Sequence, residues 1–243
     1  MRAFFAIFGR ELRAFFFSPL AYVVLFFFLI VNGFIFANLV AYLSDPRSQG
    51  GPPMGYFFTS SGILLMILGV ILTMRLVSEE LRSGSVEVLM TAPVTEGQVI
   101  GGKFLAALAF FAFLWLPTVA YAGLIAYYAS VDWGPIASGY LGLLLIGALF
   151  LSVGVFASST TRSQLAAAMM SVALILMLIL LGWLQGLVNN DTAKEVLSYV
   201  DVGAHLDEFS RGIVDTRRLV YYLSATFLFL FLATRSLEDR KWR

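Results

Sequence analysis

The chain contains no cysteine and only one histidine among its 243 residues. Without cysteine it can form no disulfide, no thiolate metal site and no cysteine nucleophile. Charged side chains make up 13% of the residues, about half of the ~25% that is usual in soluble domains. The formal net charge is only +1, so no bulk positive field points to nucleic acid as a partner.

Apolar residues dominate instead, at 60% of the chain against roughly 45–50% in ordinary soluble domains. A transmembrane helix needs about 20 mostly apolar residues, and six stretches approach or exceed that length. They are residues 20–42, 56–74, 104–129, 138–157, 165–188 and 219–234. The last is short and would need flanking residues or local bilayer thinning. The sequence predicts one all-α membrane domain over residues 1–243, and the first run, which lacks a cleavage site, is expected to span rather than to be removed.

The positive charges indicate how these spans are oriented. If both termini lie on one side of the membrane, that side holds 11 of the 16 Lys and Arg residues and the other side holds 5. Positive charge collects on the cytoplasmic side. Both termini and residues 78–94 are therefore predicted to be cytoplasmic. The outer segment 189–218 is expected to form short helices that dip towards the membrane, with Trp183 as an interface anchor.

Residues 2–17 have an amphipathic pattern. On a helical wheel one arc holds Phe4, Phe5, Phe8, Leu12, Phe15 and Phe16, and the opposite arc holds Arg2, Arg10 and Arg13. This is typical of a helix that lies in the headgroup plane with its phenylalanines towards the acyl chains. Pro19 disfavours helix at Ser18 and would separate it from the first span. The alternative is one long first helix with a kink.

The predicted spans contain no acidic residue. Pumps and ion-coupled transporters usually bury ionisable residues at mid-membrane, and a zinc hydrolase or an intramembrane serine protease needs converging ligands or a base. The one histidine, His205, is more typical of a solvated or locally hydrogen-bonded residue than of a metal site. The pairs Ala148/Ser152 and Gly154/Ser158 favour close helix packing, either within the chain or between two copies.

The segment Gly97–Phe104 matches a phosphate-binding loop up to its last position, where Phe104 replaces the required Ser or Thr. No strand precedes it, and a span follows at once. Thr95 and Gln98 instead fit a capping box that opens the third helix, and Lys103 is expected at the membrane interface. We therefore expect no nucleotide site, cofactor or metal in this chain and no enzymatic activity of its own.

Residues 79–93 form a polar segment between two apolar runs. They can form an amphipathic helix of about two turns, broken near Gly84 and stopped by Pro93. Periodicity alone supports a force-transmitting helix and an ordinary solvated loop equally. Since the spans show no source of energy, the free energy for any work would have to come from a partner.

The run Ser78-Glu79-Glu80-x-x-x-Gly84-Ser-x-Glu87-x-Leu89-x-x-x-Pro93-Val94, followed by Gly102-Lys103, resembles the ABC-2 type permeases. These are the membrane subunits of ATP-binding-cassette transporters. The start, with Arg10-Glu11-Leu12 and Phe17-Ser18-Pro19, and the end, with Phe209-Ser-Arg-Gly212, are similar to the GldF-like permeases associated with gliding motility.

The resemblance implies six transmembrane helices, an N-terminal interfacial helix (the type V exporter architecture) and a coupling helix between spans two and three. The implied ATPase-coupling residues are Glu79, Glu80, Arg82, Gly84, Glu87 and Pro93, flanked by Arg10, Glu11 and Arg13 of the interfacial helix. Two permease chains, identical or different, would work with two ATPase subunits that bind ATP and Mg²⁺. An auxiliary membrane protein with a large outer domain would be a separate partner, and the location would be the bacterial cytoplasmic (inner) membrane.

The expected function is ATP-driven export or extraction of a substrate along a seam between two permease copies, lined by spans one, two and five. Because these spans are apolar and rich in phenylalanine, a lipid-like or amphipathic substrate is favoured over a small ion. The alternative is a membrane scaffold that anchors a soluble or extracytoplasmic complex. An intramembrane enzyme is disfavoured by the missing acid, base and metal ligands.

Overall fold

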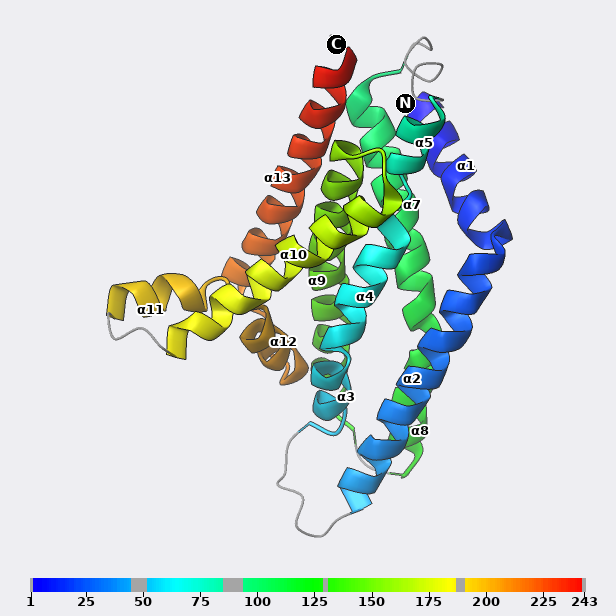
Figure 1. Ribbon diagram of the computed structural model, residues 1–243. Coiled ribbons are helices and arrows are strands. Elements are labelled where there is room, and N and C mark those ends of the chain that lie inside the picture. Colours follow the sequence, from blue (N-terminus) through cyan, green and yellow to red (C-terminus); the bar gives the residue numbers. More distant parts are fainter. Residues whose placement is uncertain (1, 45–51, 85–93, 129–130, 187–190, 242–243) are drawn as a thin grey trace.

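The computed structural model describes residues 2–44, 52–84, 94–128, 131–186 and 191–241 (Figure 1). All regular structure in these ranges is helical. The helices are α1 (Arg2–Phe17), α2 (Pro19–Ser44), α3 (Gly55–Ser60), α4 (Gly62–Thr73), α5 (Ser78–Ser83), α7 (Glu96–Trp115), α8 (Val119–Tyr128), α9 (Trp133–Thr160), α10 (Gln164–Trp183), α11 (Asp191–Ser198), α12 (Val202–Ser210) and α13 (Thr216–Lys241), with 3₁₀ turns η1 (Leu116–Thr118) and η2 (Leu184–Gly186).

Six helical segments are long and apolar enough to cross a membrane, as predicted for an all-α membrane protein. They are Pro19–Ser44, Gly62–Ser83, Glu96–Tyr128, Trp133–Thr160, Gln164–Trp183 and Thr216–Asp239. The sixth is longer than residues 219–234 because the helix continues through a charged segment, which helical hydrogen bonding tolerates and hydropathy does not detect. The fifth ends at Trp183, before the predicted residue 188.

Both termini lie at one end of the helix bundle, and α5 lies at that same end (Figure 1). The C-terminal end of α2 and the end of α8 lie at the opposite end. An even number of spans requires this arrangement. It agrees with the predicted topology, in which the termini and α5 share one side of the membrane.

Helix α9 forms the centre of the bundle. It packs against α4, α7, α10, α12 and α13. Several of its glycines leave room for a side chain of another element. Phe58 packs on Gly139, Phe209 on Gly142, Phe111 on Gly147 and Thr73 on Gly154. A Cβ at Gly142 would lie 2.8 Å from the Phe209 ring, so these contacts depend on the missing side chain. The pair Gly154/Ser158 therefore packs within one chain, which decides between the two alternatives that its spacing left open.

The remaining helices lie around this centre. Helix α10 crosses the bundle obliquely and α11 projects away from it, whereas α12 lies close to the lower part of α9 (Figure 1). Helix α12 buries Val202, Leu206 and Phe209 against its neighbours. The outer segment thus contains two short helices, of which α12 completes the apolar core.

Replacing Gly147 with alanine should destabilise the bundle, because the new Cβ would overlap the Phe111 ring. Overpacking of this kind costs about 1–3 kcal/mol. Gly123→Ala is the matched control: nothing lies within 4 Å of its Cβ position, and alanine is the better helix former. Thermal unfolding of the detergent-solubilised protein should show a lower midpoint for the first variant only. Equal midpoints would contradict the packing role assigned to Gly147.

Candidate functional site

Helix α5 is a short charged helix at the end of the second candidate span, after the turn that follows α4. Glu79 and Glu80 lie in its first turn and Arg82 in its last, and both placements favour the helix dipole. It ends at Gly84, whose φ of 72° lies in the left-handed region that glycine adopts without strain. The expected break at Gly84 is therefore present. Glu87 and Pro93 lie outside the described residues.

Ser158 on α9 holds the start of α5. Its Oγ accepts hydrogen bonds from the backbone N–H groups of Val77 at 3.1 Å and Ser78 at 3.0 Å. The same hydroxyl donates to the carbonyl oxygen of Met74 at 3.2 Å. The free N–H groups at a helix start need such acceptors. The turn between α4 and α5 is thus bonded to the central helix.

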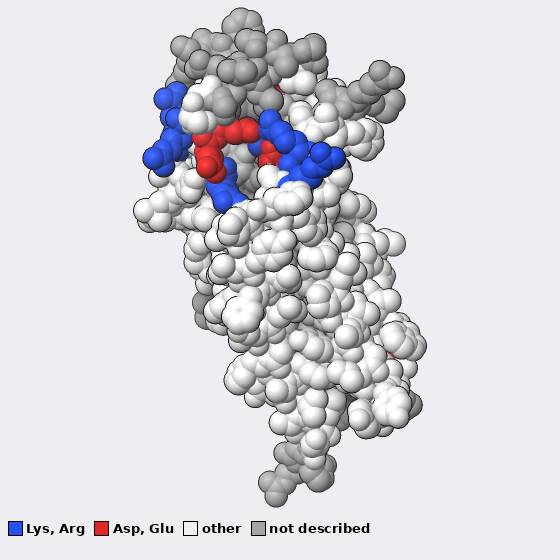
Figure 2. Space-filling view, turned by 90° about the vertical axis from the view of Figure 1, so that its right-hand side faces the viewer, with Lys and Arg blue, Asp and Glu red and all other residues white. Residues whose placement is uncertain are grey.

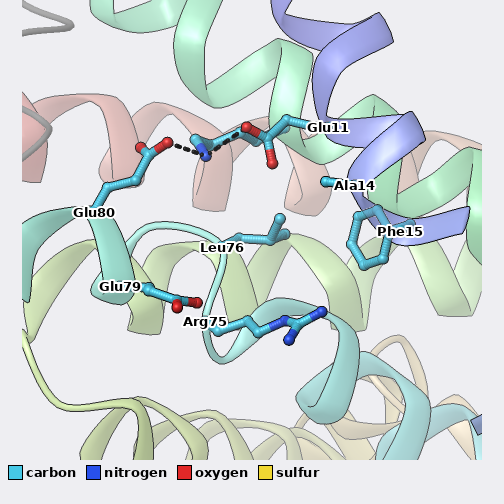
Figure 3. A pocket seen from close by; sticks show the side chains of 8 residues that line it. Glu11, Ala14, Phe15, Arg75, Leu76, Glu79 and Glu80 are labelled. Carbon is cyan, nitrogen blue, oxygen red and sulfur yellow. Dashed lines mark hydrogen bonds and ion pairs between the residues drawn. The ribbon is translucent and has the colours of Figure 1, made fainter. Parts of the chain in front are cut away.

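Four charged side chains from α1, α5 and α7 meet at the start of α5, and Figure 3 shows the two carboxylates, Glu11 and Glu80. The Nζ of Lys103, on α7, lies 2.9 Å from Oε1 of Glu80 and 3.1 Å from Oε1 of Glu11, on α1. Nη2 of Arg10 lies 3.1 Å and 2.8 Å from the same two oxygens. These residues, Arg10, Glu11, Glu80 and Lys103, are called the ionic cluster below. Each carboxylate uses one oxygen for both cations, and Oε2 of Glu80 is buried with no hydrogen-bond partner among the described residues.

The four side chains of the ionic cluster differ in how exposed they are. The side chain of Lys103 is only 2% exposed, those of Glu11 and Glu80 are 13% and 20% exposed, and that of Arg10 is 53% exposed. A buried ammonium is stable only when it is paired, so Lys103 requires both carboxylates. The hydrogen bond to Glu11 is the largest contribution that raises the pKa of the Arg10 guanidinium above its usual value. Arg10 therefore stays charged.

The phenylalanine arc of α1 is partly buried against other helices and partly exposed. Phe15 is buried and stacks on Phe110 of α7 with ring centres 5.2 Å apart, and Ile7 lies where Gly102 leaves room. Phe5 and Phe17 are exposed. Helix α1 runs beside α7 and meets α2 at a bend after Phe17 (Figure 1). The prediction that the phenylalanines of α1 face the acyl chains is thus wrong for those that pack against α7.

The structure brings together only some of the residues predicted for the site. Arg10, Glu11 and Glu80 meet in the ionic cluster, whereas Glu79, Arg82 and Arg13 are exposed outside it. Lys103, which is expected at the membrane interface, is the buried centre of the cluster. The sequence signal for this role of Lys103 was its position as a lone cation in the first turns of an otherwise apolar helix. Thr95 and Gln98 form the predicted capping box directly before it.

On the face drawn in Figure 2, charge gathers at this end of the molecule, and the surface below the charged band is largely uncharged. At the other end of α4, an apolar groove of about 560 Å³ lies between α4, α9, α10 and α12. It is lined by Thr59, Gly62, Ile63, Leu65, Met66, Ile146, Phe150, Leu176, Ile179, Leu180, Trp183, Val202, Gly203 and Leu206. The second and fifth predicted spans thus border one groove.

His205, which is expected to be solvated or locally hydrogen-bonded, is fully buried and hydrogen-bonded to a residue of another helix. Its Nδ1 lies 2.8 Å from the hydroxyl of Tyr222 on α13, and its Nε2 has no hydrogen-bond partner among the described residues. Burial, reinforced by the positive charge of Arg218, lowers the pKa of His205 to about 4. Within the described ranges no group of three or more His, Cys, Asp or Glu residues could hold a metal ion. His205 therefore ties α12 to α13 as a neutral ring.

Comparison with known proteins identifies the family. The sequence model described as ABC-2 family transporter protein matches residues 54–237, which is most of the chain and includes four of the six spans whole and nearly all of the last. This chain belongs to the ABC-2 transporter family. A comparison with curated proteins found no match. The ABC-2 permease is thus a multi-pass membrane subunit of a transporter and not itself a catalytic protein.

Replacing Lys103 with methionine should destabilise the ABC-2 permease by about 3 kcal/mol, because Glu11 and Glu80 would keep buried charge without their main partner. Adding Glu11→Gln and Glu80→Gln to Lys103→Met should recover much of this loss, since no unpaired charge then remains. Glu238→Gln, which removes an exposed pair with Arg235, should cost less than about 1 kcal/mol. Thermal unfolding measures the stability of all three variants. A triple variant no more stable than Lys103→Met would contradict the role of Lys103 as the buried partner of both carboxylates.

The buried His205 predicts a pH dependence of stability. The unfolded chain binds a proton near pH 6.5 and the folded chain only near pH 4, so the stability that His205 contributes is lost as pH falls from about 6.5 to about 4. Each pKa unit is worth about 1.4 kcal/mol, which makes the loss about 3 kcal/mol. His205→Gln should make the unfolding midpoint depend less on pH across this window than it does in the native protein. Parallel pH profiles for the two proteins would contradict this prediction.

Proposed function

We propose that this ABC-2 permease is driven by a separate ATPase that docks on α5 and the residues following it. The observation that carries the proposal is the ionic cluster. Through Glu80, the charged helix at the end of the second span is fixed to the buried ammonium of Lys103 on α7 and, through it, to Glu11 on α1. A solvated loop would have no need of a buried cation.

The contacts of α5 supply a path for force. On one side Ser158 bonds its first residues to α9, and on the other side Glu80 bonds it to α7 and α1. Movement of α5 by a docked ATPase would therefore act on three helices together. The exposed Arg82 is free to contact the partner, with Glu87 and Pro93 further along the same segment, whereas Glu79 lines a cavity between α5 and α1.

The apolar groove supports a lipid-like or amphipathic substrate. Its walls come from the second and fifth spans with α9 and α12, and nearly all of its lining residues are apolar. A small ion would find no charged side chain there. Spans one, two and five would line the seam with a second permease chain, so the groove would open to the path that the substrate takes.

The proposed assembly contains two permease chains and two copies of the ATPase, which would hold ATP and Mg²⁺, in a bacterial cytoplasmic membrane. The motifs near both ends of the chain support the gliding-motility-associated subfamily. In that case a separate auxiliary membrane protein would supply an outer domain.

Affinity purification of the tagged chain from its native membrane tests the proposal. A soluble ATPase with its own phosphate-binding loop should co-purify and hydrolyse ATP, while the permease purified alone should not. Recovery of other soluble proteins without an ATPase would instead indicate a scaffold.

Arg82→Glu reverses the charge on the exposed face of α5 without touching the ionic cluster or the cavity between α5 and α1. It should reduce the recovered ATPase about fivefold, equivalent to about 1 kcal/mol of contact free energy. The matched control is Arg235→Glu, an exposed reversal of the same sign near the end of α13, which should leave the recovery unchanged. Equal recovery with both variants would reject α5 as the docking helix.

A further inference from the structure

A second cavity, of about 190 Å³, lies between α1, the turn before α5, α5 itself and α7. Its walls combine three carboxylates, Glu11, Glu79 and Glu80, with the cations Arg75 and Lys103. Its apolar surface comes from Ala14, Phe15 and Leu76 (Figure 3). The volume corresponds to about six water molecules of liquid. It can hold a small polar group with a short apolar stem.

The three carboxylates on this cavity differ in how they are paired. Lys103 and Arg10 both bind Oε1 of Glu11 and Oε1 of Glu80, and Oε2 of Glu80 is buried without a partner among the described residues. Glu79 makes no ion pair within the described part of the chain. Oε2 of Glu80 is closed off from the cavity, whereas Glu79 is exposed and lines it. The carboxylate of Glu79 can therefore accept hydrogen bonds from a cation in the cavity that carries N–H groups.

Arg75 supplies the opposite chemistry on another wall. It donates one hydrogen bond, from Nη2 to Oγ of Ser18 at 3.2 Å, which holds the guanidinium at the junction of α1 and α2. Its other N–H groups can donate to an anionic oxygen, and arginine suits phosphate in particular. The cavity thus offers an acceptor site for an ammonium and a donor site for a phosphate a short distance apart.

The cavity also lies at the level where the apolar helices meet charged segments. Glu11–Phe15 precede the first candidate span, Arg75–Glu80 follow the apolar part of the second, and Lys103 lies in the early turns of the third. Figure 2 shows the charged band directly above the largely uncharged surface. Lipid headgroups occupy this level in a bilayer, and pockets between spans at this level bind them.

We propose that this cavity binds the headgroup of a phospholipid that carries a primary ammonium, with Glu79 accepting from the ammonium and Arg75 donating to the phosphate. The headgroup supplies the cation that Glu79 lacks, and the acyl chains lie on the apolar surface of α1 and α2. The site is separate from the apolar groove. It rests on the proposed function only in that the bound lipid would brace α5 from the side facing away from the ATPase.

Titration of the purified permease with two phospholipids that have identical acyl chains tests the proposal by native mass spectrometry. Phosphatidylethanolamine has an ammonium with N–H donors, and phosphatidylcholine has the same phosphate but a methylated cation without them. The native chain should bind the first about tenfold more tightly, which corresponds to one charge-assisted hydrogen bond. Equal binding of the two lipids would overturn the proposal and leave the cavity to a basic side chain of a docked protein.

Variants separate the two halves of the site. Glu79→Gln should lower phosphatidylethanolamine binding towards the phosphatidylcholine level, whereas Arg75→Gln should weaken both lipids. Asp239→Asn, an exposed acid near the end of α13, should change neither. An undiminished preference for phosphatidylethanolamine in Glu79→Gln would overturn the assignment. Because no ATPase is present, failure here leaves ATPase docking intact, and failure of docking leaves the lipid result intact.

Discussion

The ammonium of Lys103 is the constraint on which this end of the molecule depends. An ammonium removed from water costs several kcal/mol unless well-placed carboxylates surround it. The two carboxylates come from different helices, α1 and α5, so neither helix alone can satisfy it. The stacking of Phe15 on Phe110 and the close approach of Ile7 to Gly102 hold α1 against α7. Apolar packing and ion pairing thus require the same arrangement of helices.

The spans divide into a packed core and a lipid-facing periphery. Of the most apolar window in each span, 56% is buried for the second, 61% for the third and 72% for the fourth, against 17%, 22% and 11% for the first, fifth and sixth. The residues that hold α5 lie on the well-buried helices or pack against them, as Ser158 and Lys103 show. The first and fifth spans, which we expect to line the seam with a second permease chain, have most of their apolar surface uncovered within one chain.

Hydropathy predicted the number of spans because burial in lipid demands long apolar runs, but it could not place helix ends, since α13 continues through charged residues to Lys241. A helical wheel found the arc on α1 but could not tell whether lipid or α7 would cover it. The ionic cluster was harder still. Lys103 is 92 residues from Glu11 and 23 from Glu80, and no periodicity reports a contact over such separations. The burial of His205 depends in the same way on Tyr222, which lies on another helix.

Helix α4 connects the two ends of the proposed mechanism. Ile63 and Met66 line the apolar groove, and the turn after Thr73 leads into α5. Helices α4 and α9 are joined along their length, by Phe150 against Gly69, by Thr73 against Gly154 and by the bonds of Ser158. A displacement of α5 would therefore move α4 and α9 as one body. Helix α10, the least buried wall of the groove among the spans that form it, would not be obliged to follow. The groove would then change shape along α10, which is where a force applied at the charged end would reach an apolar substrate.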